Sequence, residues 1–338
     1  MVFKRLWRWG LALAFGLALS LVLIYTDVQQ FLDTPLSVPT GGLVLEVKPG
    51  VGIGSIARQL QQQPGLPRPA FYLEVYARLN GLASRLKAGE YALAPGVTPR
   101  TLLDRIVAGR VIQYPLTLVE GWTFRQLRQA LVSHPKLVQT LPGLSDAEVM
   151  VRLGRPGEHP EGRFLPDTYH FPAGFTDEAF LRRALAAMDQ RLTEVWNRRA
   201  PDAPVNDPYQ ALILASIIEK ETGVAAERAE IAGVFARRLR QGMRLQTDPA
   251  VIYGLGESFD GNLRRRDIET DTPYNTYTRP GLPPTPIALP GVGSLNAAVN
   301  PAPGDTLYFV ADGEGGHVFS RTLEAHNRAV QRYQLRAR

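Results

Sequence analysis

An uncharged apolar run near the start of the chain constrains its architecture more than any other feature. Residues 9–26 read WGLALAFGLALSLVLIYT, and these 18 residues are enough for a helix to cross the hydrocarbon core of a membrane. The first charge after the run is Asp27, and the basic residues before it are Lys4, Arg5 and Arg8. Positive charge ahead of a span favours a cytoplasmic N-terminus. We therefore predict a cytoplasmic tail at 1–8, a transmembrane helix at 9–26, and the rest of the chain on the periplasmic or extracytoplasmic side of the inner membrane.

Two other interpretations of the run remain open. A cleaved signal peptide has a shorter apolar core followed by small residues, whereas Tyr25, Thr26 and Asp27 follow here. A buried helix of a soluble core is the second interpretation, and the terminal position and the basic flank argue against it. Because no second run of this kind follows, the sequence predicts a single crossing.

The composition narrows the classes of function. Hydrophobic residues make up 45% and charged residues 21%, as in globular proteins. The net charge of +6 is spread along the chain, with its densest run at residues 264–266, and no basic stripe is interleaved with aromatic residues, so nucleic acid is not an expected partner. The chain has no cysteine, and its five histidines lack metal-ligand spacing. We expect no metal and no cofactor.

Two soluble parts are expected after the span. Residues 27–42 are rich in Pro and Gly and predict a linker. A small α+β unit is then expected at residues 43–112, in the order strand, helix, helix, strand, helix. Its predicted elements are 43–47, 53–60, 70–79, 86–93 and 99–107.

The remaining residues, 113–338, predict a larger mixed α+β domain, so the fold class is α+β. Thr123 is a predicted N-cap, and the chain is rich in turns from Gly242 onward. The predicted helices are 124–132, 146–152, 177–196, 208–223, 226–240 and 323–335. The predicted strands are 111–119 and 306–311, the latter followed by a hairpin through 313–319.

The helix at 208–223 has an unusual end, where an apolar run leads directly into Glu219, Lys220 and Glu221. A carboxyl at the end of a buried helix is desolvated, and this favours the protonated acid. Residues i and i+2 point about 200° apart on a helix, so only one of the two glutamates can face a given cleft. Periodicity does not choose between them, and a solvated helix end stays an alternative.

Two further segments have the composition of a carbohydrate groove. Residues 245–249 contain Gln246, and residues 273–277 contain Tyr274, Asn275 and Tyr277. Aromatic rings stack on sugar faces, and amides pair with hydroxyl and acetamido groups. We predict that these four residues bind substrate, while ordered packing of the loops is the alternative.

The motif ASIIEKET at residues 215–222 resembles the endolytic murein transglycosylase family, also called YceG-like. The match continues along the whole chain through several motifs in one order. These are GMRLQTDP at 242–249, YNTY at 274–277, GLPP at 281–284, FVADG at 309–313, GH at 316–317 and HN at 326–327.

The resemblance implies an enzyme, a peptidoglycan lytic transglycosylase, and it assigns the catalytic role to Glu219, the first Glu of the motif. Glu219 would donate a proton to the glycosidic oxygen between MurNAc and GlcNAc and then activate the muramyl 6-hydroxyl, which gives a 1,6-anhydro end. The resemblance also implies a LysM-like subdomain at 43–112, a YceG-like catalytic domain at 113–338, and penicillin-binding glycan polymerases as partners. A non-catalytic peptidoglycan-binding scaffold and a lysozyme-type hydrolase are the competing interpretations.

Overall fold

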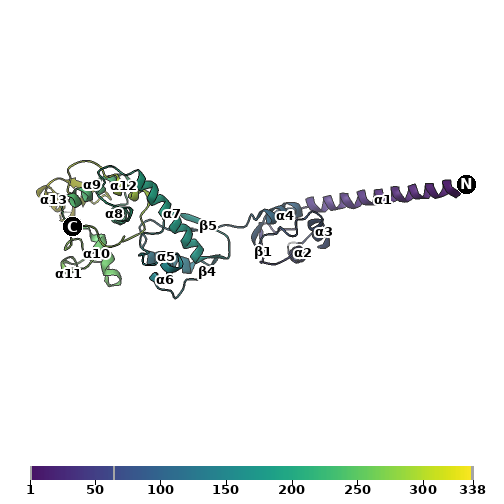
Figure 1. Ribbon diagram of the computed structural model, residues 1–338, viewed down its shortest axis with the longest axis horizontal. Coiled ribbons are helices and arrows are strands. Elements are labelled where there is room, and N and C mark those ends of the chain that lie inside the picture. The colour runs from purple at the N-terminus through teal and green to yellow at the C-terminus, as the bar shows by residue number, and fades with distance from the viewer. Residues whose placement is uncertain (1, 64, 336–338) are drawn as a thin grey trace. The chain divides into compact units, whose positions relative to one another are not determined.

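The computed structural model describes residues 2–63 and 65–335, and the chain divides into two compact units. Unit 1 comprises Met1–Tyr114 with His170–Gly174, and unit 2 comprises Pro115–Tyr169 with Phe175–Arg338 (Figure 1). The assignment of residues 170–174 to unit 1 was not predicted, and the functional domains at 43–112 and 113–338 stay a prediction. The side chains of residues 2–6, which include part of the predicted basic flank, lie outside the described residues.

Helix α1 (Val2–Asp33) carries the apolar run. Within the described residues, Trp7–Asp33 is the one helical segment that is long and apolar enough to cross a membrane, judged by length and composition, and none of its most apolar window is buried in the protein. Leu13 and Phe15, for example, are 74% and 71% exposed. Side chains of this kind need an apolar environment that the chain itself does not supply.

The predicted linker at 27–42 is wrong over its first part. Helix α1 continues to Asp33, and Phe31, Leu32 and Leu36 are buried in the core of unit 1. The Pro and Gly residues that suggested a linker lie mostly beyond these apolar side chains. Burial of Phe31 and Leu32 stabilises the last turns of α1 within the folded unit, and Leu36 joins the same core just after the helix ends.

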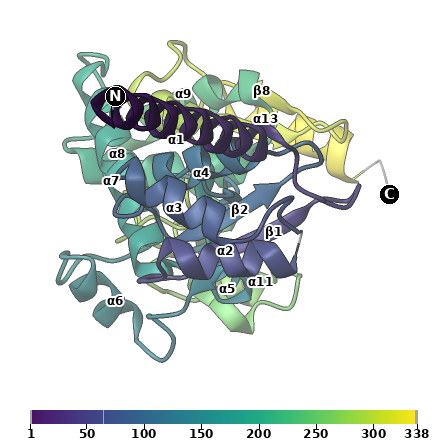
Figure 2. The same cartoon turned by 90° about the vertical axis from the view of Figure 1, so that its right-hand side faces the viewer.

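Unit 1 is a small α+β structure, as predicted. Strands β1 (Leu43–Val47) and β2 (Gly89–Leu93) pair antiparallel with Leu45 opposite Tyr91, and both of these side chains are buried. The two strands lie side by side next to the helices in Figure 2. Its other helices are α2 (Ile53–Gln62), α3 (Phe71–Leu79) and α4 (Pro99–Ala108).

Unit 2 is built around helix α8 (Pro208–Glu221), which is buried continuously from Ala211 to Ile218. Such a helix can be stable only inside a shell of other helices. The helices that pack directly on it are α7 (Asp177–Asn197), α9 (Arg228–Arg240), α10 (Asp248–Leu255) and α12 (Val292–Val299).

Short strands and further helices make up the rest of the described chain. Three two-stranded sheets pair β3 with β5, β4 with β6 in parallel, and β7 with β8 antiparallel. The strands are β3 (Tyr114–Thr117), β4 (Leu137–Val138), β5 (Thr168–Phe171), β6 (Phe175–Thr176), β7 (Tyr308–Ala311) and β8 (His317–Ser320). The remaining α-helices are α5 (Phe124–Ser133), α6 (Asp146–Arg152), α11 (Arg265–Glu269) and α13 (Leu323–Val330).

Sequence patterns located the helix starts better than the irregular regions. Thr123 caps α5 through a capping box with Gln126, as predicted. The β7–β8 hairpin is also confirmed. Helices α10, α11 and α12 were not predicted, because their turns lie among the Pro and Gly residues that signalled loops.

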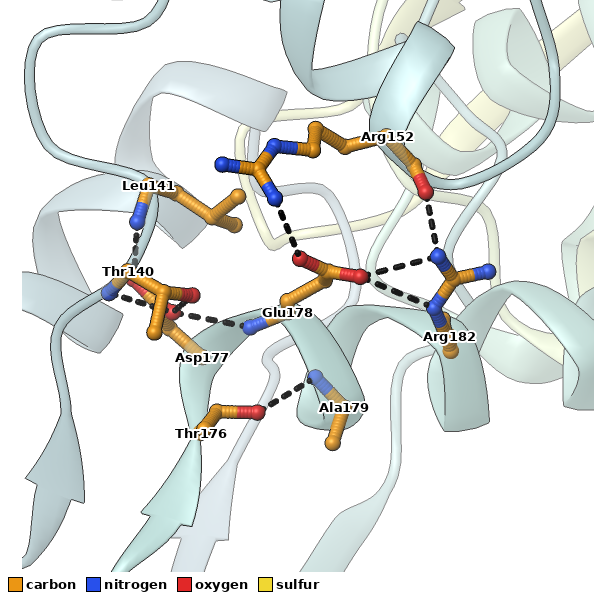
Figure 3. Close-up of polar contacts among 8 residues, drawn as sticks. All are labelled: Thr140, Leu141, Arg152, Thr176, Asp177, Glu178, Ala179 and Arg182. Carbon is orange, nitrogen blue, oxygen red and sulfur yellow. Dashed lines mark hydrogen bonds and ion pairs between the residues drawn. The ribbon is translucent and has the colours of Figure 1, made fainter.

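A buried carboxylate connects the segment that follows β4 to the start of α7 (Figure 3). Asp177 is 2% exposed and accepts hydrogen bonds from the backbone nitrogens of Thr140 and Leu141, at 2.9 and 3.1 Å, and from the Thr140 hydroxyl. The next residue, Glu178, pairs with Arg182 at 2.8 Å and lies 3.7 Å from Arg152. Since the carboxylates of Asp177 and Glu178 find their hydrogen-bond and ion-pair partners within the protein, we assign the cluster a structural role.

Candidate active site

The EKET motif forms the C-terminal end of α8, and its side chains contact different neighbours. Asp207 caps the start of the helix, and Thr222 leaves it with an extended backbone. Within the helix, Ser216 donates to the Ile213 carbonyl at 2.7 Å and accepts from Ile287 N at 3.0 Å. The buried helix therefore holds its last turn, with Glu219 and Glu221, in a fixed position.

Glu219 points toward the start of α12. Its Oε2 accepts hydrogen bonds from Gly291 N at 2.9 Å and from the Ser294 hydroxyl at 2.7 Å. Its Oε1 lies 3.5 Å from the Arg228 guanidinium, and its side chain is 6% exposed. A carboxylate at a helix N-terminus is favourably placed against the helix dipole. These contacts fasten α8 to α12 and to α9.

Glu221 points to a different side of α8 and lines a groove of about 540 Å³. Burial of its carboxyl among surrounding protein atoms raises its pKa to about 7, and the nearby charge of Asp248 acts in the same direction. The residue nevertheless keeps part of its surface exposed. The prediction that the two glutamates diverge is confirmed, and the carboxyl with the raised pKa is Glu221.

Two of the predicted groove residues lie with Glu221. Gln246 and Tyr277 both line its groove, and the Tyr277 hydroxyl donates to Asp248 Oδ1 at 2.5 Å. Gln246 is exposed and has a φ of 52°, the one left-handed backbone among the described non-glycine residues. Strain of this kind is often found at functional sites, where it aims a side chain.

The other two predicted residues face the protein interior. Asn275 is fully buried, and its amide donates to the carbonyl oxygens of Ile268 and Thr270 at 2.8 and 2.6 Å while accepting from Tyr277 N at 2.9 Å. Tyr274 packs on the core, with its hydroxyl 2.8 Å from that of Thr285. The geometry therefore places both among the loop contacts rather than in the groove beside Glu221.

Sequence reasoning missed a cationic and aromatic wall of the same groove. Arg238 is 6% exposed and donates to the carbonyl oxygens of Leu307 and Leu245 at 2.7 and 2.6 Å. Its guanidinium lies 5.3 Å from the centre of the Tyr308 ring, on which the His326 ring stacks. The sequence contained a signal for this wall, because Arg238 stands on the otherwise apolar face of α9.

A second buried carboxyl lies elsewhere in unit 2. Glu161 lines a cavity of about 760 Å³, is 3% exposed, and has its pKa raised by burial to about 7. Its two oxygens accept from Phe124 N at 2.9 Å and from the Tyr253 hydroxyl at 3.1 Å. Since both oxygens are occupied by donors of the protein, Glu161 is less suited than Glu221 to exchange a proton with a ligand.

Comparisons with known proteins agree on the family. The model of the YceG-like family matches residues 45–332. The chain is 31% identical to an endolytic murein transglycosylase of Bacillus subtilis strain 168, with 86% of this chain and 84% of that protein aligned. It is 28% identical to an endolytic murein transglycosylase of Streptococcus pneumoniae serotype 2, where 90% of this chain aligns with only 61% of the longer pneumococcal protein.

A solved structure is similar over most of the chain. A crystal structure of a YceG-like protein from Listeria monocytogenes aligns with a TM-score of 0.56 and 30% sequence identity. The alignment covers 85% of this chain and 98% of the Listeria chain. The similarity therefore extends over nearly all of the solved relative.

Proposed function

The chain belongs to the YceG-like family, and from this premise we propose that it is an endolytic lytic transglycosylase of peptidoglycan. The substrate is the β-1,4 bond between MurNAc and GlcNAc in nascent glycan strands, whose elongation the cut terminates. The observation that carries this proposal is the Glu221 carboxyl, poised near neutral pKa on a groove that also presents an amide and a phenol.

The first chemical step needs a proton donor. With a pKa of about 7, Glu221 is protonated in a large fraction of molecules at neutral pH. The acid donates its proton to the glycosidic oxygen as the bond to C1 of the muramyl sugar breaks. The GlcNAc side leaves as an alcohol, and positive charge develops at C1.

The second step uses the same carboxyl as a base. The ionised Glu221 removes the proton of the muramyl 6-hydroxyl, whose oxygen bonds to C1 and closes a 1,6-anhydro ring. No water is consumed and Glu221 is reprotonated. Common glycosidases use two carboxyl groups, but an internal hydroxyl has a high effective concentration, so a single carboxyl suffices.

The choice of Glu221 differs from the role that the family resemblance gives Glu219. Support for Glu221 comes from its groove and its raised pKa. Glu219, in contrast, has one oxygen engaged by Gly291 and Ser294 and the other near Arg228. Gln246 and Tyr277 are the proposed substrate contacts from the original four, and Arg238 is added as a charged neighbour of the reacting acid.

The proposal also includes a location. Helix α1 anchors the protein in the inner membrane with its N-terminus in the cytoplasm, so that both units meet glycan outside it. Unit 1 is proposed to bind glycan as a LysM-like module, and penicillin-binding glycan polymerases are the proposed partners at the same membrane face.

Mass spectrometry of digested glycan tests the reaction. Purified protein is incubated with nascent peptidoglycan strands, and the new ends are analysed. We expect 1,6-anhydro-MurNAc ends, lighter by one water than free reducing ends. Reducing ends would identify a hydrolase, and an absence of any cut would favour a non-catalytic scaffold.

A further inference from the structure

Unit 1 exposes an apolar groove between α1 and α3. It has a volume of about 760 Å³ and is formed largely by Leu21, Ile24, Tyr25, Phe71, Val75 and Leu79. On α3, Leu79 is 83% exposed, Phe71 57% and Val75 47%. These three residues repeat every four positions and form one stripe. The opposite side of α3 buries Leu73 and Ala77, so the helix is apolar on two faces, which is unusual for one that water surrounds.

Polar contacts fix α3 against the end of the apolar run of α1. Asp27, the first charge after the run, accepts hydrogen bonds from the Tyr72 hydroxyl at 2.7 Å and from Arg68 at 2.8 Å. The Tyr72 ring also lies 5.4 Å from that of Phe31. Arg100 of α4 bonds the Asp33 carboxylate at 2.7 Å. Tyr72 thus holds α3 directly against α1, while Arg68 and Arg100 fix neighbouring parts of unit 1 to the same helix.

The groove brings α3 together with the end of the apolar run of α1. Tyr72 at the start of α3 pairs with Asp27, whereas Leu79 at its end lines the same groove as Leu21. Helices α1 and α3 contact each other, and Phe71 and Val75 line this groove too. Leu21 precedes Asp27 by six residues, which corresponds to about 9 Å at 1.5 Å per residue. Apolar residues of α3 therefore share a groove with Leu21, Ile24 and Tyr25, which the proposed membrane span contains.

We propose that α3 lies in the outer boundary of the bilayer and that phospholipid acyl chains fill the groove between α1 and α3. This inference rests on the proposed anchoring by α1. The groove continues the exposed apolar surface of that helix, where Leu21, Ile24 and Tyr25 are 59%, 61% and 64% exposed. A surface that is continuous with a lipid-facing helix meets the same lipid. Partial insertion to 5–10 Å is the known depth of interfacial helices.

Charge near the end of α3 fits this partner. Arg85 in the loop after α3 is exposed, and Arg78 is 67% exposed along its side chain while it pairs with Glu74 at 2.6 Å. Long basic side chains extend from apolar surface to lipid phosphates. Unit 1 is then held on the membrane by α3 as well as by α1, in one orientation, and does not move on a free tether.

Site-specific labelling tests the proposal, because the chain has no cysteine of its own. Val75→Cys is compared with Val44→Cys, a matched valine on β1 that is 58% exposed and does not line the groove. Each full-length variant is reconstituted in phosphatidylethanolamine and phosphatidylglycerol vesicles and labelled with nitrobenzoxadiazole. We expect blue-shifted emission at position 75 only, iodide quenching reduced about threefold or more relative to position 44, and quenching by shallow nitroxide lipids.

The outcomes separate this proposal from the anchoring on which it rests. If carbonate washing releases the full chain from vesicles, the anchor and the lipid groove both fail. If the chain stays in the membrane but iodide quenches both labels equally, the groove proposal alone is overturned. Protection of position 75 that requires added membrane proteins would assign the groove to a protein and overturn the lipid assignment.

Discussion

Glu219 and Glu221 lie two residues apart at one helix end, yet their surroundings are opposite. Glu219 accepts two hydrogen bonds from the start of α12, lies beside Arg228, and is nearly buried. Glu221 lines a groove and has a pKa of about 7 because protein atoms replace much of its water. A desolvated carboxyl that a ligand can still reach is suited to donate a proton. A carboxyl whose oxygens already accept hydrogen bonds from the protein stabilises the fold instead.

The largest expected effect concerns catalysis by these two side chains. Glu221→Gln removes the transferable proton, and we expect kcat/KM for glycan cleavage to fall by about 10²–10⁴-fold. Glu219→Gln keeps an acceptor for Gly291 and Ser294, and we expect it to cost about tenfold or less, through small shifts of α8. Release of anhydro-muropeptides measures both variants. The reverse ranking would return the acid role to Glu219.

The next largest expected effect is on the free energy of unfolding, to which Glu221 and Glu219 contribute differently. The folded-state pKa of Glu221 is raised from 4.5 to about 7, so the folded protein binds the proton more tightly than the unfolded chain. Stability from this group is therefore present below pH 4.5 and lost as pH rises through 7. We expect Glu221→Gln to be the more stable protein at pH 8 by up to about 3 kcal/mol, at ~1.4 kcal/mol per unit of pKa difference. Urea unfolding at pH 5 and pH 8 measures this.

The same urea experiment provides a control. Glu219→Gln loses the charge beside Arg228 and is expected to be less stable than wild type at pH 8 by about 1 kcal/mol. If both variants gained stability equally at pH 8, general relief of negative charge would explain the result and Glu221 would not be special.

The pH dependence of catalysis separates the two carboxyls further. Since the acid form of Glu221 begins the reaction, kcat/KM should be constant below about pH 7 and fall about tenfold per pH unit above it. Glu219→Gln should keep this midpoint. A decline already centred near pH 4.5 would mean that the reacting carboxyl has an ordinary pKa and is not Glu221.

Much of the helical framework around these residues could be predicted from sequence. The apolar run of α8 and the N-cap Thr123 carry local signals, because helix periodicity and capping act over a few residues. The divergence of Glu219 and Glu221 follows from helix geometry alone. Which of the two faces a groove depends on α12 and on β7, elements about 70 to 90 residues further along the chain, and no local pattern contains that information.

The irregular part of the site was harder to predict. In the sequence, Asn275 and Tyr277 look equivalent as polar loop residues. In the structure, the Asn275 amide points inward and bonds the backbone of its own loop, whereas Tyr277 lines the groove. The extension of α1 into unit 1 could not be predicted from the sequence for a related reason. Proline and glycine signal irregular backbone locally, while the burial of Phe31 and Leu32 is a tertiary effect.

The smallest expected effect tests whether the groove beside Glu221 is the one that binds glycan. Gln246 has a φ of 52°, which costs a side-chain-bearing residue about 1 kcal/mol, so Gln246→Gly should gain up to about 1 kcal/mol in stability. It also removes the amide proposed to contact sugar, and we expect KM to rise about tenfold. Gln241→Gly is the matched control, because Gln241 is also exposed but has a φ of −90° and lies outside the groove. That variant should lose stability and leave KM unchanged. Equal KM values for the two variants would mean that glycan does not bind in the groove beside Glu221. The surface near Glu219 would then be the better candidate for the binding site.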